Sequence, residues 1–250
     1  MKQLGIILFM CAVYNTAIAQ EDYTKSLKGI EWIKIESKAD ITLKMHSKDQ
    51  LLIKVSRAIE TPEKAKGLKL VGEDGSDNTD IGFYVIQEGN NLIVKNLRRS
   101  EGAVIYLPAD QNISVKSTWQ GDIEIYGFVG EIEASAELNG SITIKDVSGP
   151  ITANALNGEV EVVFTKVSQD SPITLYTTNG VLDVTMPKNT PANLSLYSTH
   201  GDIYTDFEIN FPEKNGLKAI SHKKFTGAIN NGGVDVKLNS TNGNIYLREQ

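Results

Sequence analysis

The chain has little cysteine, few aromatic residues and no basic block. Its one cysteine, Cys11, lies in the N-terminal segment that we expect to be removed, which leaves no disulfide or thiolate chemistry in the mature chain. The formal net charge is −6, or −7 once the single charge of Lys2 is subtracted. A mildly acidic chain of this kind is a poor partner for nucleic acid or for an anionic membrane.

Long apolar runs are also lacking, because no stretch is long enough to span a bilayer. Residues 1–19 have the features of a secretory signal peptide: a positive Lys2, the apolar segment Leu4–Tyr14, and small residues at a cleavage site, Ala17–Ala19. We therefore expect an exported protein of the periplasm or cell surface that begins at Gln20, with no membrane insertion after cleavage.

Motifs of catalysis are absent. The chain contains no Gly-x-Ser-x-Gly, no His-Glu-x-x-His and no phosphate-binding loop. Its histidines, His46, His200 and His222, are far apart in the sequence, and His200 has the setting of a surface turn residue. The sequence predicts no catalytic residue, no metal ligand and no cofactor, so we expect a protein that is not an enzyme.

What the chain does have is a glycine at nearly fixed intervals between Trp119 and Phe164. The glycines are Gly121, Gly130, Gly140, Gly149 and Gly158. After each comes one polar or variable residue and then an alternating apolar pair, such as Ile123 and Ile125. Alternation of this kind predicts a short strand with one buried face, and a glycine at its start predicts a tight corner.

Strands this short bury their apolar faces only by stacking on one another, which predicts a β-solenoid with two strands per coil. The same phase returns after Gly180, Gly201, Gly232 and Gly243. We therefore expect Ile123, Ile142, Val160 and Ile203 to share one interior. The fold class predicted is all-β, a single-domain β-solenoid that resembles a β-helix.

The expected organisation is a signal peptide at 1–19, an N-terminal β region at 20–112 that caps the solenoid, and the repeat region at 113–250. An insertion at 207–228 interrupts the repeat. The last strand, Asn244–Leu247, is followed by only three residues, so we expect it to form an open edge that Arg248 and Glu249 blunt.

The corners resemble those of a bacterial envelope family described as putative adhesins. The resemblance covers residues from about 100 to the C-terminus, and its motifs are Ile105–Pro108, Leu156–Gly158, Thr177–Gly180, Asn231–Gly233 and Ser240–Leu247. Pro150 and Val181 depart from the acidic or polar residue that this family often has after the corner. The resemblance implies an all-β solenoid of unknown molecular function, since its motifs are structural corners.

Acidic residues offer two alternatives. Carboxylates recur after the glycines, at Asp122, Glu131, Glu159 and Asp202, and at the outward positions Glu124, Glu133, Glu161, Asp183 and Asp235. Such acids would suit a carbohydrate-active β-helix enzyme, although a solvated outer face with this period explains them as well. The acidic loop 72–80, with Asp74, Asp77 and Asp80, has some of the oxygen ligands that calcium needs, and we interpret it as a turn.

Four tyrosines are the candidate binding residues. If the alternating aliphatic residues point inward, then Tyr176, Tyr197, Tyr204 and Tyr246 point outward, where they could stack on sugars or anchor a protein. Strand propensity alone would also place tyrosines there. The sequence thus favours a secreted binding or scaffold protein of the cell envelope, whose partner is an envelope protein or glycan. A structural partner of an envelope complex is a further alternative.

Overall fold

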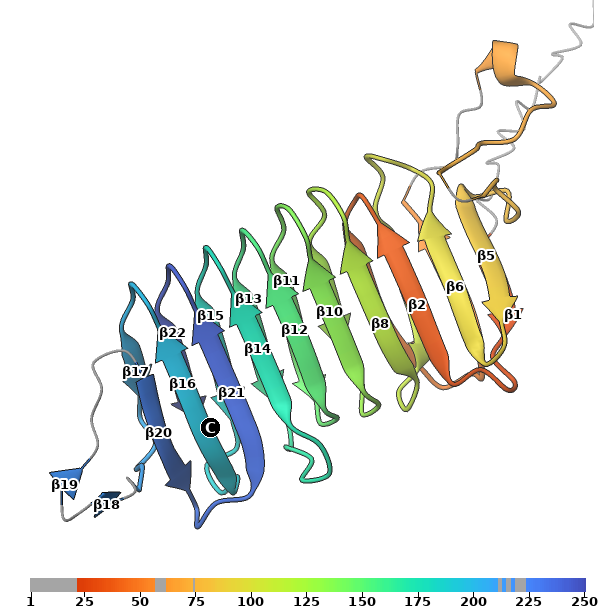
Figure 1. The fold of residues 1–250 in the computed structure, drawn as a ribbon. Coiled ribbons are helices and arrows are strands. Elements are labelled where there is room, and N and C mark those ends of the chain that lie inside the picture. Colours follow the sequence, from red (N-terminus) through yellow and green to blue (C-terminus); the bar gives the residue numbers. More distant parts are fainter. Residues whose placement is uncertain (1–21, 57–61, 74, 211–212, 215–216, 219–223) are drawn as a thin grey trace, which may run out of the picture.

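The computed structural model describes residues 22–56, 62–73, 75–210, 213–214, 217–218 and 224–250. The signal-peptide segment, Asp74 and His222 lie outside these residues, as does part of the expected insertion. The described chain forms two ten-stranded sheets that face each other along an elongated stack (Figure 1). This arrangement confirms the predicted all-β solenoid, because each coil consists of one strand from each sheet.

Sheet A runs in the spatial order β1 (Tyr23–Ser26), β4 (Gln50–Val55), β7 (Ala103–Pro108), β3 (Ile41–His46), β9 (Ile123–Tyr126), β11 (Ile142–Val147), β13 (Val160–Phe164), β15 (Leu182–Met186), β22 (Ile245–Glu249), β17 (Ile203–Thr205). Sheet B runs in the opposite listing order β20 (Lys224–Ile229), β16 (Ala192–Ser198), β21 (Val234–Ser240), β14 (Ile173–Thr177), β12 (Ile151–Ala155), β10 (Ile132–Ala136), β8 (Asn112–Ser117), β2 (Trp32–Ser37), β6 (Asn91–Asn96), β5 (Phe83–Glu88). Outside the two sheets lie a short 3-10 helix, Glu63–Ala65, and the two-stranded pair β18 (Glu213–Lys214) and β19 (Leu217–Lys218).

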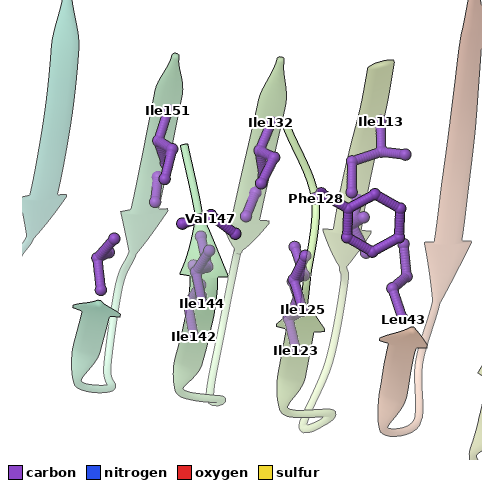
Figure 2. Packing of buried hydrophobic residues seen from close by; sticks show 14 of the residues in the cluster. Leu43, Ile113, Ile123, Ile125, Phe128, Ile132, Ile142, Ile144, Val147 and Ile151 are labelled. Atoms are coloured by element: carbon purple, nitrogen blue, oxygen red, sulfur yellow. The ribbon is translucent and has the colours of Figure 1, made fainter. Parts of the chain in front are cut away.

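The interior is a continuous aliphatic column. Ile142 pairs in register with Ile123 on one side and with Val160 on the other, and all three are buried. Ile203 packs against the same cluster at the end of the stack. Figure 2 shows how isoleucines from successive coils point into the space between the sheets. Each fully buried side chain of this size contributes about 1.5–3 kcal/mol relative to exposure, so the column is the main source of stability.

The glycines stand in a column at the corner between each sheet B strand and the following sheet A strand. A Cβ added to Gly180 would overlap the carbonyl oxygen of Gly158, and one added to Gly158 would overlap that of Gly140. No positive φ is recorded at Gly158 or Gly180, so close approach of the coils, rather than left-handed backbone, requires glycine there. We expected a glycine to supply a bend, and the structure shows that its more important contribution is the absence of a side chain.

Asparagines next to these glycines form a ladder along the same corner. Asn179 Nδ2 donates to Asn157 Oδ1 at 2.7 Å, and Asn242 Nδ2 donates to Asn179 Oδ1 at 2.7 Å. Asn157 Nδ2 continues the ladder to the carbonyl oxygen of Leu138 at 2.8 Å. The Asn-Gly pairs therefore fasten each coil to the one before it.

The order of coils in space differs from their order in the chain at both ends. The first coil, β2 with β3, lies between the coil β6–β7 and the coil β8–β9. The last coil, β21 with β22, lies between β14–β15 and β16–β17. In Figure 1 these coils stand out as an orange strand among yellow-green neighbours and a blue strand beside teal ones. The sheets continue across residue 112, and the domain boundary expected there stays a prediction.

The predicted open edge at the last strand is wrong. β22 pairs in parallel with β15 on one side and with β17 on the other. The expectation failed because it assumed that coils stack in chain order. At this end of the stack, the edge of sheet A is the short strand β17, and β20 pairs antiparallel along the outer side of β16 in sheet B.

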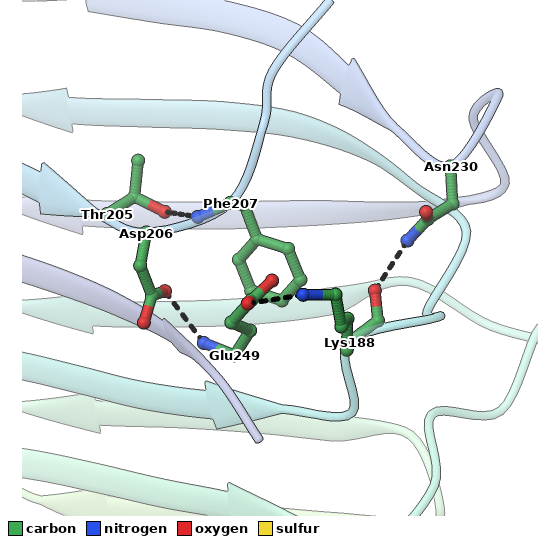
Figure 3. A network of polar contacts seen from close by, with 6 residues as sticks. All are labelled: Lys188, Thr205, Asp206, Phe207, Asn230 and Glu249. Carbon is green, nitrogen blue, oxygen red and sulfur yellow. Dashed lines mark hydrogen bonds and ion pairs between the residues drawn. The ribbon is translucent and has the colours of Figure 1, made fainter.

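Polar contacts hold the inserted coil in place (Figure 3). Lys188 Nζ donates to Glu249 Oε1 at 2.9 Å, and the backbone N–H of Glu249 donates to Asp206 Oδ1 at 2.8 Å. Asn230, just before the coil, donates its amide to the carbonyl oxygens of Lys188 and Thr190. These contacts join β22 and its approach to the segments on both of its sides.

Candidate binding surface

The four candidate tyrosines all lie on strands whose alternate residues are buried, but they face two different sides of the molecule. Tyr176 on β14 and Tyr197 on β16 belong to sheet B. Tyr204 on β17 and Tyr246 on β22 belong to sheet A. The structure therefore forms two separate pairs instead of one cluster, and the binding role of each stays a prediction.

The sheet A pair makes most of its contacts within the protein. The rings of Tyr204 and Tyr246 stack at a centroid distance of 5.3 Å with an interplanar angle of 13°. The guanidinium carbon of Arg248 lies 5.2 Å from the centroid of the Tyr246 ring. Arg248 also binds Asp183 through two nitrogens, at 2.8 and 2.9 Å. Tyr246 thus uses its ring against neighbouring side chains, and Tyr204, at 50% exposure, is the open member of the pair.

The sheet B pair is held differently. The hydroxyl of Tyr176 accepts a hydrogen bond from Thr178 Oγ1 at 3.1 Å and lies 3.3 Å from Thr241 Oγ1. These hydrogen bonds lower the pKa of Tyr176, because hydroxyl donors stabilise the phenolate. By contrast, the charge of Asp202 raises the pKa of Tyr204. The threonines fix the tip of the Tyr176 side chain through hydrogen bonds at its hydroxyl.

Two asparagines lie in the same row as the sheet B tyrosines. In the parallel ladders, Tyr176 is in register with Asn154 on β12 and with Asn239 on β21, and Asn239 is in register with Tyr197 on β16. We call Asn154, Tyr176, Asn239 and Tyr197 the amide–tyrosine row. Within the described chain, no hydrogen bond joins the side-chain amide of Asn154 or Asn239 to a partner.

Sequence reasoning missed the two asparagines. Their signal was present, since Asn154 lies between buried Ala153 and Ala155, and Asn239 lies between buried Leu238 and Ser240. Alternation alone shows that they point outward. It does not show that they flank Tyr176, because that depends on the insertion of β21 between β14 and β16.

The outward carboxylates of sheet A are largely paired with cations. Lys145 Nζ lies 2.8 Å from Glu161 Oε1, and the hydrogen bond to this carboxylate raises the pKa of Lys145. Asp183 is in register with Glu161 on the next strand and is bound by Arg248. The four side chains form a charge sequence of plus, minus, minus, plus across neighbouring strands. The other outward acids divide between the faces, with Glu124 on sheet A and Glu133 and Asp235 on sheet B.

In the acidic loop, the carboxylate of Asp77 is buried and accepts hydrogen bonds from its own turn. Its oxygens accept from the backbone N–H of Thr79, Asp80 and Gly82 and from the Thr79 hydroxyl. Asp77 therefore acts as the central acceptor of a turn. Over the part of the chain that the structure describes, there is no group of three or more His, Cys, Asp or Glu side chains placed to hold a metal ion.

The described histidines have structural contacts. His46 Nε2 lies 2.7 Å from the carbonyl oxygen of Gln50, four residues along the chain. His200 occupies the Asn-Gly corner at the position where other coils have asparagine, and its Nδ1 lies 3.3 Å from the carbonyl oxygen of Thr241. The predicted surface turn setting of His200 agrees with this position.

Residues 136–248 match the Toastrack DUF4097 family model, which confirms the family resemblance for that part of the chain. A putative cell adhesion protein from Clostridium sporogenes aligns at 10% identity over 92% of this chain and 99% of its own, with a TM-score of 0.47. A putative adhesin from Bacteroides fragilis aligns at 14% identity over 92% and 96%, with a TM-score of 0.44. The comparison with curated proteins found no match. No helix among the described residues is long and apolar enough to cross a membrane.

Proposed function

We propose that this protein is an exported, non-enzymatic β-solenoid that serves as an adhesin-like binding or scaffold protein in the bacterial cell envelope. The observation that carries the proposal is the display of outward aromatic side chains on two regular sheets above a continuous buried column. A surface of this kind holds its contact residues at fixed spacing, which lowers the ordering cost of binding. The Toastrack match over residues 136–248 supports the solenoid architecture on which the display depends.

Export and retention test the proposal together. The full chain, expressed with its N-terminal segment and a C-terminal tag, is expected to lose that segment and to fractionate with the envelope. Cross-linking in intact cells followed by solubilisation is expected to recover an envelope glycan or protein with it. A chain that stays in the cytoplasm with its N-terminal segment attached would contradict the proposal.

The enzyme alternative has its own assay. The exported protein is incubated with neutral and acidic polysaccharides, with and without calcium, and new reducing or unsaturated ends are measured. We expect none above a heat-denatured control. Reproducible release that is lost in Glu161→Gln or Asp183→Asn, whose carboxylates are in register on neighbouring strands of sheet A, would replace binding with catalysis.

A further inference from the structure

We infer that the amide–tyrosine row of sheet B is a binding site for a neutral glycan chain that runs across the strands. This inference rests on the proposed function and names the class of ligand for one of its two faces. Tyrosine rings stack on the apolar faces of sugar rings, and side-chain amides exchange hydrogen bonds with sugar hydroxyls. The row alternates these two groups across four neighbouring strands: Asn154, Tyr176, Asn239, Tyr197.

The spacing of the row suits an extended oligosaccharide. Neighbouring strands lie about 4.8 Å apart, so the two tyrosines, separated by β21, are roughly 10 Å apart. Asn239 lies between them in register with both, and Asn154 lies on the far side of Tyr176. A linear chain crossing the strands would therefore meet a ring, an amide and a second ring in turn.

The charge around the row favours a neutral ligand. Its neighbours on sheet B are mostly hydroxyl-bearing: Ser135 beside Asn154, and Thr152, Thr174 and Ser195 one step along the strands. Lys237 on β21 is the cation nearest in register, and Asp235 lies two residues before it on the same strand. Sheet A differs, because its outward face carries the charge sequence Lys145, Glu161, Asp183, Arg248.

The row also holds its binding groups ready. The Tyr176 hydroxyl is fixed by Thr178 and Thr241, so the ring loses less freedom when a ligand binds. The amides of Asn154 and Asn239 make no hydrogen bond within the described chain, whereas Asn157, Asn179 and Asn242 at the corner are joined in a ladder. The side chains that a sugar hydroxyl would need are thus available.

The test is titration of the exported protein with cellohexaose, mannohexaose, chitohexaose and neutral polysaccharide fractions of the envelope, with hexagalacturonate as the acidic comparison. Binding is measured by calorimetry and by tyrosine fluorescence. We expect a neutral ligand to bind, and Tyr176→Ala and Tyr197→Ala each to raise its Kd by roughly tenfold. Asn154→Ala and Asn239→Ala are expected to raise it by about threefold or more.

Tyr204→Ala on sheet A is the matched control, because it removes an outward tyrosine of the same end of the stack and should leave the Kd unchanged. Thermal unfolding of each variant reports whether it folds, and Tyr176→Phe, which keeps the ring but loses the threonine contacts, should raise the Kd by only about threefold. Failure of every neutral ligand to bind, or binding that Tyr204→Ala weakens and Tyr176→Ala does not, would overturn the inference.

Two other results would also overturn it while leaving the proposed function standing. One is preferential binding of hexagalacturonate that is lost in Lys237→Gln, which would make the ligand an acidic glycan. The other is capture of an envelope protein that depends on Tyr176 and Tyr197 in the absence of any glycan binding. The proposed function itself fails separately, by the export and retention measurement.

Discussion

The Asn-Gly corner and the outer face of sheet B use the same residue type in opposite ways. At the corner, Asn179 donates to Asn157 and accepts from Asn242, so its amide is consumed by the stack. On the face, Asn154 is exposed and has no hydrogen-bond partner among the described residues. Repetition therefore does not assign a role to a residue, because the role depends on which side of the coil the side chain occupies.

The largest expected effect is at the corner backbone. Gly180→Ala places a Cβ against the carbonyl oxygen of Gly158, and neither coil can move away without breaking the ladders on its other side. We expect the free energy of unfolding to fall by about 3 kcal/mol. Denaturant unfolding measures it, and a loss of under about 1 kcal/mol would show that the coils are not so tightly stacked.

A glycine outside the corner provides the control for this substitution. Gly89, in the hairpin between β5 and β6, has φ +60° and no atom within 4 Å of an added Cβ. Gly89→Ala should therefore cost only the left-handed backbone strain, about 1 kcal/mol. The pair of variants separates lack of space from backbone conformation.

The second prediction compares asparagines directly. Asn179→Ala removes two ladder hydrogen bonds, and we expect it to lower the free energy of unfolding by about 1 kcal/mol. Asn154→Ala removes none within the described chain and should change it by less than about 0.5 kcal/mol. Equal losses in the two variants, measured by the same denaturant titration, would erase the distinction between corner and face.

The smallest expected effect is in the ionisation of the tyrosines. The pKa of Tyr176 is lowered by its hydrogen bonds to Thr178 and Thr241, and the pKa of Tyr204 is raised by the charge of Asp202. In an alkaline titration followed by tyrosinate absorbance, Tyr176→Phe should remove an early part of the rise and Tyr204→Phe a late part. The reverse order would mean that the threonine contacts are not formed in solution.

The signs of the two stability contributions are opposite. Tyr176 ionises more readily in the folded state, so its contribution to the free energy of unfolding grows as the pH rises from its lowered pKa through the ordinary value of 10.0. Tyr204 has a raised folded pKa, so its contribution is present below 10.0 and is lost as the pH rises through the folded value. Comparison of each Phe variant with the parent chain across this range isolates the two contributions.

Much of the fold was predictable because its rules are local. Alternation set the buried positions of Ile123, Ile142 and Val160, and the spacing of Gly140 and Gly158 set the corners. The same alternation placed Tyr176 and Tyr204 outward. It could not place them on different sheets relative to their partners, nor show that Tyr204 stacks on Tyr246, because both facts depend on contacts between coils.

The sequence by itself determined which side chains point inward and where each coil turns, since these follow from strand geometry and from the lack of a glycine side chain. Only the tertiary structure decided which coil lies beside which. Both edges of a parallel coil present the same pattern of backbone donors and acceptors, so any coil can pair with any other. The choice falls to contacts such as Lys188 with Glu249, and it is this choice that brings Asn239 between the two tyrosines.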